Sequence, residues 1–440
     1  MQNRAEQAFG GRRHLTYFRE FAQHWPNLLG AGLGLALGPA INHYMMNLFG
    51  PPLIAEFGWT KAQFALVGVL GIAGMLVLPI AGRITDRFGA RVATIIGFSA
   101  VPAGYFALSL QSGSIHEFYG ILLFTYVLGV FATTFVFTRV VVERFDRARG
   151  LALSCLLSFP PLTGALAVQF IGDIIEDQGW RAGYRALAMV SALGGVAAVI
   201  LIGRSPPQPV EQSTTGASSA AKGSRLNWAD FRSIARKPVF LFLLAGMFFC
   251  NLPQVLVSSQ MNIMLMENGA SARFATTLVS AYAISVVVGR FMSGIALDRI
   301  PAHIVAIVAL GLPAIGYVAL ASTFDAYWIL TMAIVLVGLA QGAETDVSAI
   351  LTSRKFSMAH YSFIFSLLMA SMGIASALGS GLLSGTLAAT GTFDLFLAFC
   401  ALATVIGAIC FFLTGRYGRE ASTVAVTAPP TNSPIAGEQA

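Results

Sequence analysis

Three ionisable residues lie inside long apolar stretches of this sequence. Arg290 interrupts the stretch 274–297, and Glu344 and Asp346 interrupt the stretch 327–352. Each stretch is long enough to cross a bilayer as a helix, where a charged side chain near the centre costs about 2.5–3.5 kcal/mol on insertion scales. Residues that are retained at such a cost are candidates for a functional site.

Arg290 is suited to bind an anion. It precedes Asp298 by eight residues, or about 12 Å along a helix, which places it near the middle of the bilayer. Its guanidinium group presents N–H donors in a planar fork that matches a carboxylate. We therefore predict that Arg290 binds an anionic substrate, the alternative being a structural ion pair within the protein.

The carboxylates of 327–352 occupy different faces of a helix. Residues two positions apart point about 200° apart, so Glu344 and Asp346 cannot face one cavity. Asp346 shares its face with Gly338 and Gly342, which indicates a close helix contact. Glu344 shares its face with a polar stripe: Gln341, Thr345, Ser348 and Thr352. We favour Glu344 as the proton carrier and Asp346 as a counter-charge, and the reverse assignment stays open.

Other polar residues extend the predicted substrate site. Such side chains either touch substrate or join helices by hydrogen bonds. Those that we predict to contact substrate, besides Arg290, are Asn42, His43, Tyr44, Gln254, Ser258, Ser259 and Gln341.

Catalytic, metal-binding and nucleotide-binding motifs are absent from the sequence. It contains no GxxxxGK[ST], HExxH or GxSxG motif, so neither ATP-driven transport nor hydrolysis is indicated. The four cysteines fall in apolar stretches without CxxC spacing, which favours neither disulfides nor zinc. We expect no enzyme activity, no metal and no cofactor.

The composition is that of a polytopic membrane protein. Hydrophobic residues make up 56% of the chain and charged residues 11%, whereas soluble domains carry about 25% charged residues. Because a span needs about 20 apolar residues, we predict twelve helices: 26–50, 62–82, 91–111, 117–139, 150–172, 184–203, 239–263, 274–297, 302–322, 327–352, 358–385 and 391–414.

The basic residues predict the orientation of these helices. With the N-terminus inside, 22 of the 27 Lys and Arg residues fall in cytoplasmic segments, four in outer segments and one, Arg290, in a span. This asymmetry follows the positive-inside rule and places both termini in the cytoplasm. The net charge of +7 is therefore explained by topology, and no nucleic-acid partner is expected.

The polar intervals predict the domain organisation. The predicted units are a cytoplasmic N-terminal segment without a cleavable signal peptide (1–25), a six-helix bundle (26–203), a cytoplasmic linker (204–238), a second six-helix bundle (239–414) and a disordered cytoplasmic tail (415–440).

An internal repeat supports two related halves. Gly82-Arg-Ile-Thr-Asp86-Arg87-Phe-Gly89-Ala-Arg91 ends the second span, and Gly294-Ile-Ala-Leu-Asp298-Arg299 ends the eighth span. A carboxylate at a helix end can pair with arginines across a gap that opens and closes. We predict a gate formed by Gly82, Asp86, Arg87, Gly89, Arg91, Asp298 and Arg299.

The stretch from Gly82 to Arg91 resembles the signature loop of the major facilitator superfamily. Shorter stretches are similar to its monocarboxylate-transporter-like and oxalate/formate-antiporter-like branch: Pro51-Pro-Leu-Ile-Ala-Glu56-Phe-Gly-Trp59-Thr, Arg147-Ala-Arg149-Gly150-Leu-Ala, Gly179-Trp180-Arg181 and Gly289-Arg290-x-x-x-Gly294. In that branch an Arg on the eighth helix binds the substrate anion. Members often carry an Asp one turn earlier, where this chain has Val286.

The resemblance implies an all-α membrane protein with twelve transmembrane helices in two pseudo-symmetric six-helix bundles, the major facilitator fold. We expect a monomeric secondary transporter in the lipid of the inner membrane, which moves a small organic anion by alternating access together with a proton. The alternatives are an organic-anion exchanger, a proton-coupled drug efflux pump, and a transporter-like membrane sensor without net flux.

Overall fold

A computed structural model describes residues 2–145, 148–203, 236–322, 326–356 and 358–417, and their regular structure is helical. The first half comprises α1 (Gln2–Leu37), η1 (Pro39–Ile41), α2 (Asn42–Phe57), α3 (Lys61–Ala65), α4 (Val67–Phe88), α5 (Ala90–Leu110), α6 (Ile115–Gly129), η2 (Val130–Ala132), α7 (Thr134–Arg144), α8 (Arg149–Gln178) and α9 (Trp180–Ile202). The second half comprises α11 (Pro238–Asn251), η3 (Leu256–Gln260), α12 (Met261–Glu267), α13 (Ala272–Arg299), α14 (Ala302–Gly311), α15 (Pro313–Leu320), α16 (Tyr327–Lys355), α17 (Met358–Thr390) and α18 (Asp394–Tyr417).

The helices match the predicted spans. Among the described residues, eleven helical segments are long and apolar enough to cross a membrane, and they coincide with the predicted second to twelfth spans. The first predicted span is divided between α1 and α2, because Gly38 and Pro39 interrupt the helix and a 3-10 turn follows. Proline lacks the N–H that a continuous helix would need at this point. The predicted all-helical class is confirmed.

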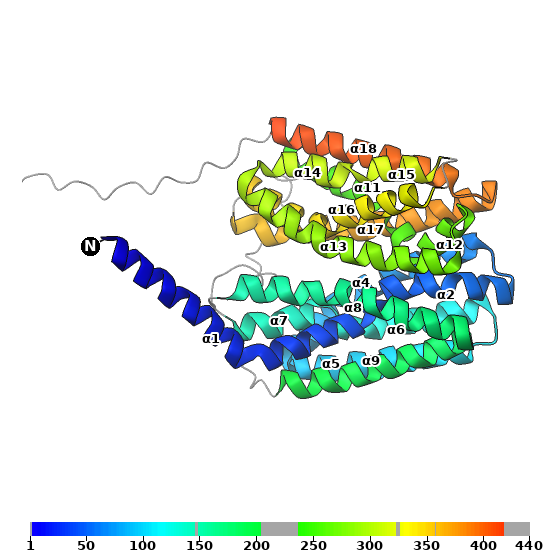
Figure 1. Ribbon diagram of the computed structural model, residues 1–440, viewed down its shortest axis with the longest axis horizontal. Helices are drawn as coiled ribbons and strands as arrows, with labels where there is room; N and C mark the ends of the chain where they lie inside the picture. Colours follow the sequence, from blue (N-terminus) through cyan, green and yellow to red (C-terminus); the bar gives the residue numbers. More distant parts are fainter. Residues whose placement is uncertain (1, 146–147, 204–235, 323–325, 357, 418–440) are drawn as a thin grey trace, which may run out of the picture.

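The chain forms two bundles that lie side by side, α1–α9 in one and α11–α18 in the other (Figure 1). Across their interface α8 packs on α13, α4 on α17, and α2 on η3 and α12. The fifth span therefore meets the eighth, the second meets the eleventh, and the first meets the seventh. This pairing is the pattern expected of a duplicated six-helix unit.

The side that is predicted to face outward, called the outer side below, is closed by contacts between the halves. Lys61 at the start of α3 forms an ion pair with Glu267 at the end of α12. Deeper in the interface, Gln169 of α8 donates a hydrogen bond to Ser280 of α13 at 2.9 Å. The Ser280 hydroxyl in turn donates to the Ala165 carbonyl at 3.0 Å.

Two short stretches that indicated the carboxylate-transporter branch meet on the outer side. Glu56 at the end of α2 accepts hydrogen bonds from the Trp180 indole and from Arg181, each at 2.6 Å. These two donors hold the pKa of Glu56 below its usual range. Trp59 donates to the Gly113 carbonyl at 2.8 Å. These hydrogen bonds join the ends of the first, third and sixth spans on the outer side of the bundle.

The predicted gate lies at the opposite end, between α4 and α5. Gly89 adopts a φ of +85° there, a conformation that residues with a side chain rarely take. Arg87 is exposed and Arg91 is half-buried. The side chains of Asp86 and Asp298 lie outside the described part of the structure, as do residues 204–235 of the predicted linker and 418–440 of the predicted tail.

Helices α13 and α16 make a close backbone contact through three glycines. A Cβ atom on Gly342 would lie 2.0 Å from the Val286 carbonyl oxygen and 2.7 Å from the Arg290 nitrogen. A Cβ on Gly338 would lie 2.8 Å from the Tyr282 carbonyl oxygen, and one on Gly289 would lie 2.1 Å from the Leu339 carbonyl oxygen. Spacing of small residues four apart allows such close approach in membranes. The close helix contact that Gly338 and Gly342 indicated is confirmed.

We expect Gly342→Ala to destabilise the protein, because the added methyl group collides with α13 backbone that cannot rotate away. Overpacking of this kind costs about 1–3 kcal/mol, which should lower the thermal unfolding midpoint of the purified protein in detergent. The matched control is Gly381→Ala on α17, whose added methyl group meets no atom within 4 Å. Equal midpoints for the two variants would contradict the predicted backbone contact.

Candidate functional site

Arg290 lies on α13 beside the contact with α16, at the interface between the halves. Its side chain is half-buried. Its Nη1 atom is fully buried and has no hydrogen-bond partner among the described residues. Buried polar groups in folded proteins are almost always satisfied. This guanidinium N–H is therefore a buried donor that remains available to a hydrogen-bond acceptor.

Two residues from different helices share the electrostatic environment of Arg290. Asp346 of α16 and Tyr44 of α2 both lie within its electrostatic reach. The contact through Gly342 places Asp346 beside Arg290, since Gly342 abuts the Arg290 backbone nitrogen and Asp346 follows one turn later. Val286, where the branch often has an Asp, packs its carbonyl on Gly342. The local carboxylate thus comes from the neighbouring helix.

An aromatic cluster on α2 and α13 borders Arg290. The Tyr44 ring lies against Gly164 of α8, where a Cβ would come within 2.5 Å of it. The His43 Nε2 and Tyr282 hydroxyl form a hydrogen bond of 3.2 Å across the halves. The rings of Tyr44 and Tyr282 have centroids 6.2 Å apart. His43 and Tyr44, both predicted from sequence, therefore lie at the interface with Arg290.

Asn47 joins the halves in a way that the sequence did not reveal. Its side chain is fully buried; its amide donates to the Val257 carbonyl at 2.8 Å, and its oxygen accepts from the Met261 N–H at 2.8 Å. Both partners flank or lie in the π-helical turn η3, where the seventh span leaves α-helical geometry. An Asn in an apolar stretch, opposite a Pro-containing helix, is the signal that could have indicated this contact.

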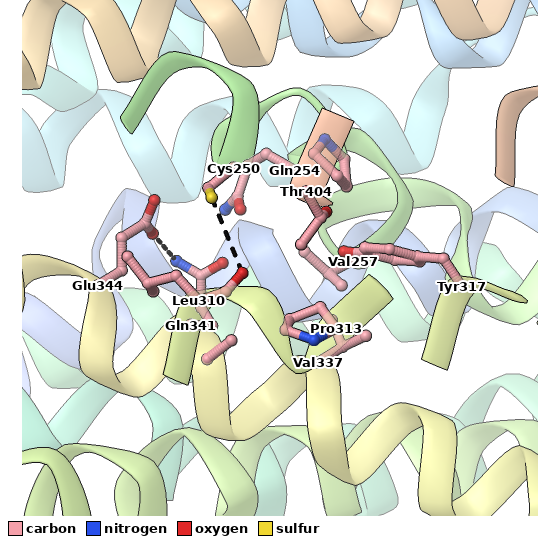
Figure 2. A pocket seen from close by; sticks show the side chains of 12 residues that line it. Cys250, Gln254, Val257, Leu310, Pro313, Tyr317, Val337, Gln341, Glu344 and Thr404 are labelled. Carbon is pink, nitrogen blue, oxygen red and sulfur yellow. Dashed lines mark hydrogen bonds between the residues drawn. The ribbon is translucent and has the colours of Figure 1, made fainter. Parts of the chain in front are cut away.

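Glu344 faces the interior of the second bundle, a different environment from that of Arg290. It is 5% exposed, accepts a hydrogen bond from the Asn251 amide and accepts another from the Gln341 amide at 2.8 Å. It lines a cavity of about 30 Å³ between α11, α14, α15, α16 and α18 (Figure 2). The polar stripe of α16 therefore borders a cavity within one bundle, whereas we expected it to line the cavity between the halves.

The remaining predicted substrate contacts are divided by the fold. Gln254 and Gln341 line the Glu344 cavity. Ser258 and Ser259 donate to the Val255 carbonyl of their own helix, at 3.3 and 3.2 Å. Asn42 donates to the Tyr126 hydroxyl at 2.9 Å, inside the first bundle. Arg290, His43 and Tyr44 thus remain as a group at the interface between the halves, and Ser258 and Ser259 lie on η3, which packs on α2 across the same interface.

The chain is similar to characterised transporters over half its length. It is 25% identical over 229 residues to the proline/betaine transporter of Salmonella typhimurium, covering 50% of this chain and 45% of that protein. It is 25% identical over 218 residues to the glycine betaine/proline/ectoine/pipecolic acid transporter OusA of Dickeya dadantii, covering 48% of this chain and 42% of that protein. The chain thus spans less than half the length of these relatives.

Solved structures share the fold of the whole chain. The nucleoside transporter NupG has a TM-score of 0.68 at 13% identity, with 90% of this chain and 99% of that chain covered. The inward-open xylose transporter XylE from E. coli has a TM-score of 0.65 at 14% identity, with 92% and 98% covered. At this level of identity the likeness concerns the fold.

The family is shown by the sequence itself. Residues 32–266 match the Major Facilitator Superfamily, and residues 248–436 match it a second time. The two matches together span both bundles, in agreement with the paired helices and the shared fold. The chain belongs to the Major Facilitator Superfamily, a family of membrane transporters.

Proposed function

We propose that this protein is a secondary active transporter of the inner membrane which moves a small organic anion, and that Arg290 binds the carboxylate of the substrate. The observation that carries this proposal is the buried Arg290 Nη1 without a hydrogen-bond partner among the described residues. A carboxylate oxygen would satisfy this donor, and the planar guanidinium can bind both oxygens of the group.

The relatives support a carboxylate as the shared feature of the substrate. The names of two of them include proline, betaine, ectoine and pipecolic acid, and each of these compounds bears a carboxylate. Tyr44 lies within the electrostatic reach of Arg290, and His43 and Tyr282 adjoin Tyr44; together they offer hydrogen-bonding groups on aromatic surfaces. Such surfaces suit the less polar body of a small organic acid.

We assign the coupling proton to Asp346, which reverses the assignment favoured by the sequence. Asp346 lies within the electrostatic reach of Arg290, so its negative charge compensates the guanidinium when no substrate is bound. A bound carboxylate takes over that compensation, and a second negative charge beside it is then unfavourable. Protonation of Asp346 relieves the repulsion, which links substrate binding to proton uptake. Glu344 is separated from this exchange by its place inside one bundle.

We expect Arg290→Lys to lose most substrate uptake although it keeps the positive charge, because an ammonium cannot reproduce the bidentate fork. Loss of a charge-assisted hydrogen bond of about 1.5–3 kcal/mol corresponds to an affinity reduced by roughly 10- to 150-fold. The measurement is substrate affinity and initial uptake in proteoliposomes, with Arg273→Lys, on an outer segment, as a control that preserves both. Near-normal affinity in the Arg290→Lys variant would assign Arg290 to a structural role.

The assignment of the proton predicts a separation of two activities. Asp346→Asn should abolish accumulation driven by a pH gradient and spare substrate counterflow, because exchange needs binding and reorientation but no net proton movement. Both activities are measured in the same proteoliposomes, with Glu344→Gln as the comparison variant. If Glu344→Gln loses only the pH-driven step and Asp346→Asn retains it, the two assignments are exchanged. If neither variant loses it, anion exchange becomes the better description.

A further inference from the structure

The cavity lined by Glu344 contains a carboxyl group and no basic side chain in its described lining. Its described lining is Cys250, Pro253, Gln254, Val257, Leu310, Pro313, Tyr317, Val337, Ala340, Gln341, Glu344 and Thr404, none of which is Lys, Arg or His. The ionisable groups in this lining besides Glu344 are the Cys250 thiol and the Tyr317 hydroxyl, which are ordinarily neutral. A carboxylate in this setting needs a positive partner from outside the chain or must be neutralised.

Two side-chain amides donate hydrogen bonds to Glu344. One oxygen accepts from the Asn251 amide and the other accepts from the Gln341 amide. Both oxygens of an ionised carboxylate can accept hydrogen bonds, and a protonated one must in addition place its own O–H on an acceptor. In its charged form Glu344 gives the cavity one uncompensated negative charge.

Oxygen atoms of the kind that bind small hard cations line the same cavity as Glu344. The side-chain oxygens of Gln254, Gln341 and Thr404 belong to groups that line the cavity together with Glu344. In Figure 2 the Gln341 amide lies between Glu344 and the interior of the cavity, opposite Cys250 and Gln254. Carboxylate, amide carbonyl and hydroxyl oxygens are better ligands for alkali and alkaline-earth ions than for transition-metal ions.

Two interrupted helices border the same cavity. Pro253 stands where α11 ends before the π-helical turn, and Pro313 stands where α14 ends and α15 begins. Both prolines line the cavity. Proline breaks the helical hydrogen-bond ladder and frees backbone carbonyl groups, and broken helices in secondary transporters supply carbonyls to bound cations. This observation is independent of the charge on Glu344.

We propose that the Glu344 cavity is a binding site for a sodium ion, with Glu344 as its charged ligand and Gln341, Gln254 and Thr404 as neutral ligands. A monovalent ion neutralises the single carboxylate, whereas a divalent ion would leave a net positive charge in an apolar bundle. The cavity volume of about 30 Å³ exceeds the roughly 10–15 Å³ that one water molecule needs, so the cavity accommodates one dehydrated ion. The site is separate from Arg290 and does not depend on the identity of the substrate.

The test uses the purified full-length protein in detergent at a pH above 8, where protons compete little. The thermal unfolding midpoint is followed as NaCl replaces choline chloride at constant ionic strength. A ligand that binds only the folded state stabilises it in a saturable manner, so we expect sodium to raise the midpoint by roughly 2–4 °C. Potassium at equal concentration should give a smaller shift. Equilibrium dialysis with radioactive sodium supplies a second readout.

Matched variants assign the effect to this cavity. Glu344→Gln should abolish the sodium-dependent shift and the bound radioactive sodium, whereas Asp346→Asn, on the opposite face of α16, should retain both. Gln341→Leu keeps the carboxylate but removes a neutral ligand, and it should raise the sodium concentration at half-effect by at least about tenfold, the lower limit for the loss of an outer-shell partner. If Glu344→Gln does not fold, Gln341→Leu and Gln254→Leu carry the assignment.

Four outcomes would overturn the proposal. They are a wild-type midpoint that does not change when sodium replaces choline, an equal shift with potassium, a sodium shift that persists in Glu344→Gln, and sodium titrations that are unchanged in both Gln341→Leu and Gln254→Leu. A Glu344-dependent effect of pH on stability without any effect of sodium would identify a proton site instead. None of these outcomes bears on the binding of a carboxylate by Arg290, which the uptake of Arg290→Lys tests separately.

Discussion

The close packing of α13 on α16 is the constraint on which the candidate site depends. Gly342 brings the backbone of α16 against the Arg290 nitrogen, and Gly338 and Gly289 extend the same contact along both helices. Lipid supplies little hydrophobic drive for helix association, so small residues that allow backbone contact carry much of the packing. This contact sets the distance between Arg290 and Asp346, and hence the strength of their electrostatic coupling. The geometry of the candidate site therefore depends on three glycines, Gly289, Gly338 and Gly342, that allow the two helix backbones to touch.

The second bundle keeps its two carboxylates in different surroundings. Asp346 shares the field of Arg290 near the interface with the first bundle, whereas Glu344 is enclosed by its own bundle with two amide donors. Arg290, the charged partner of Asp346, also has Tyr44 of the first bundle within its electrostatic reach, so the surroundings of this pair depend on both halves. A charge inside one bundle keeps its surroundings during a rigid-body movement. This difference suits Asp346 to coupling and Glu344 to a resident or co-transported cation.

Interrupted helices recur where function is proposed. The first span breaks at Gly38 and Pro39, and the seventh span passes through the π-helical turn Leu256–Gln260. Backbone groups freed in lipid cost several kcal/mol each unless they find partners. Asn47 satisfies one carbonyl and one N–H of the seventh span from the opposite half. The same Asn47 side chain therefore joins the two halves and supplies partners to backbone groups of the interrupted seventh span.

The sequence by itself determined the number of spans, the duplication of a six-helix unit and the three ionisable residues inside the spans, Arg290, Glu344 and Asp346. Each of these features depends on local composition and spacing. Helical periodicity also separated Glu344 from Asp346 and indicated the glycine contact of α16. Tertiary structure alone decided which face of α16 meets α13. The helical spacing of polar and small residues shows that two faces of a helix differ, but it does not show which neighbouring helix packs on each face. It therefore placed Gln254 and Gln341 beside Glu344 and not beside Arg290, and it revealed Asn47. These outcomes depend on contacts between residues some 90 to 210 positions apart, which no local pattern records.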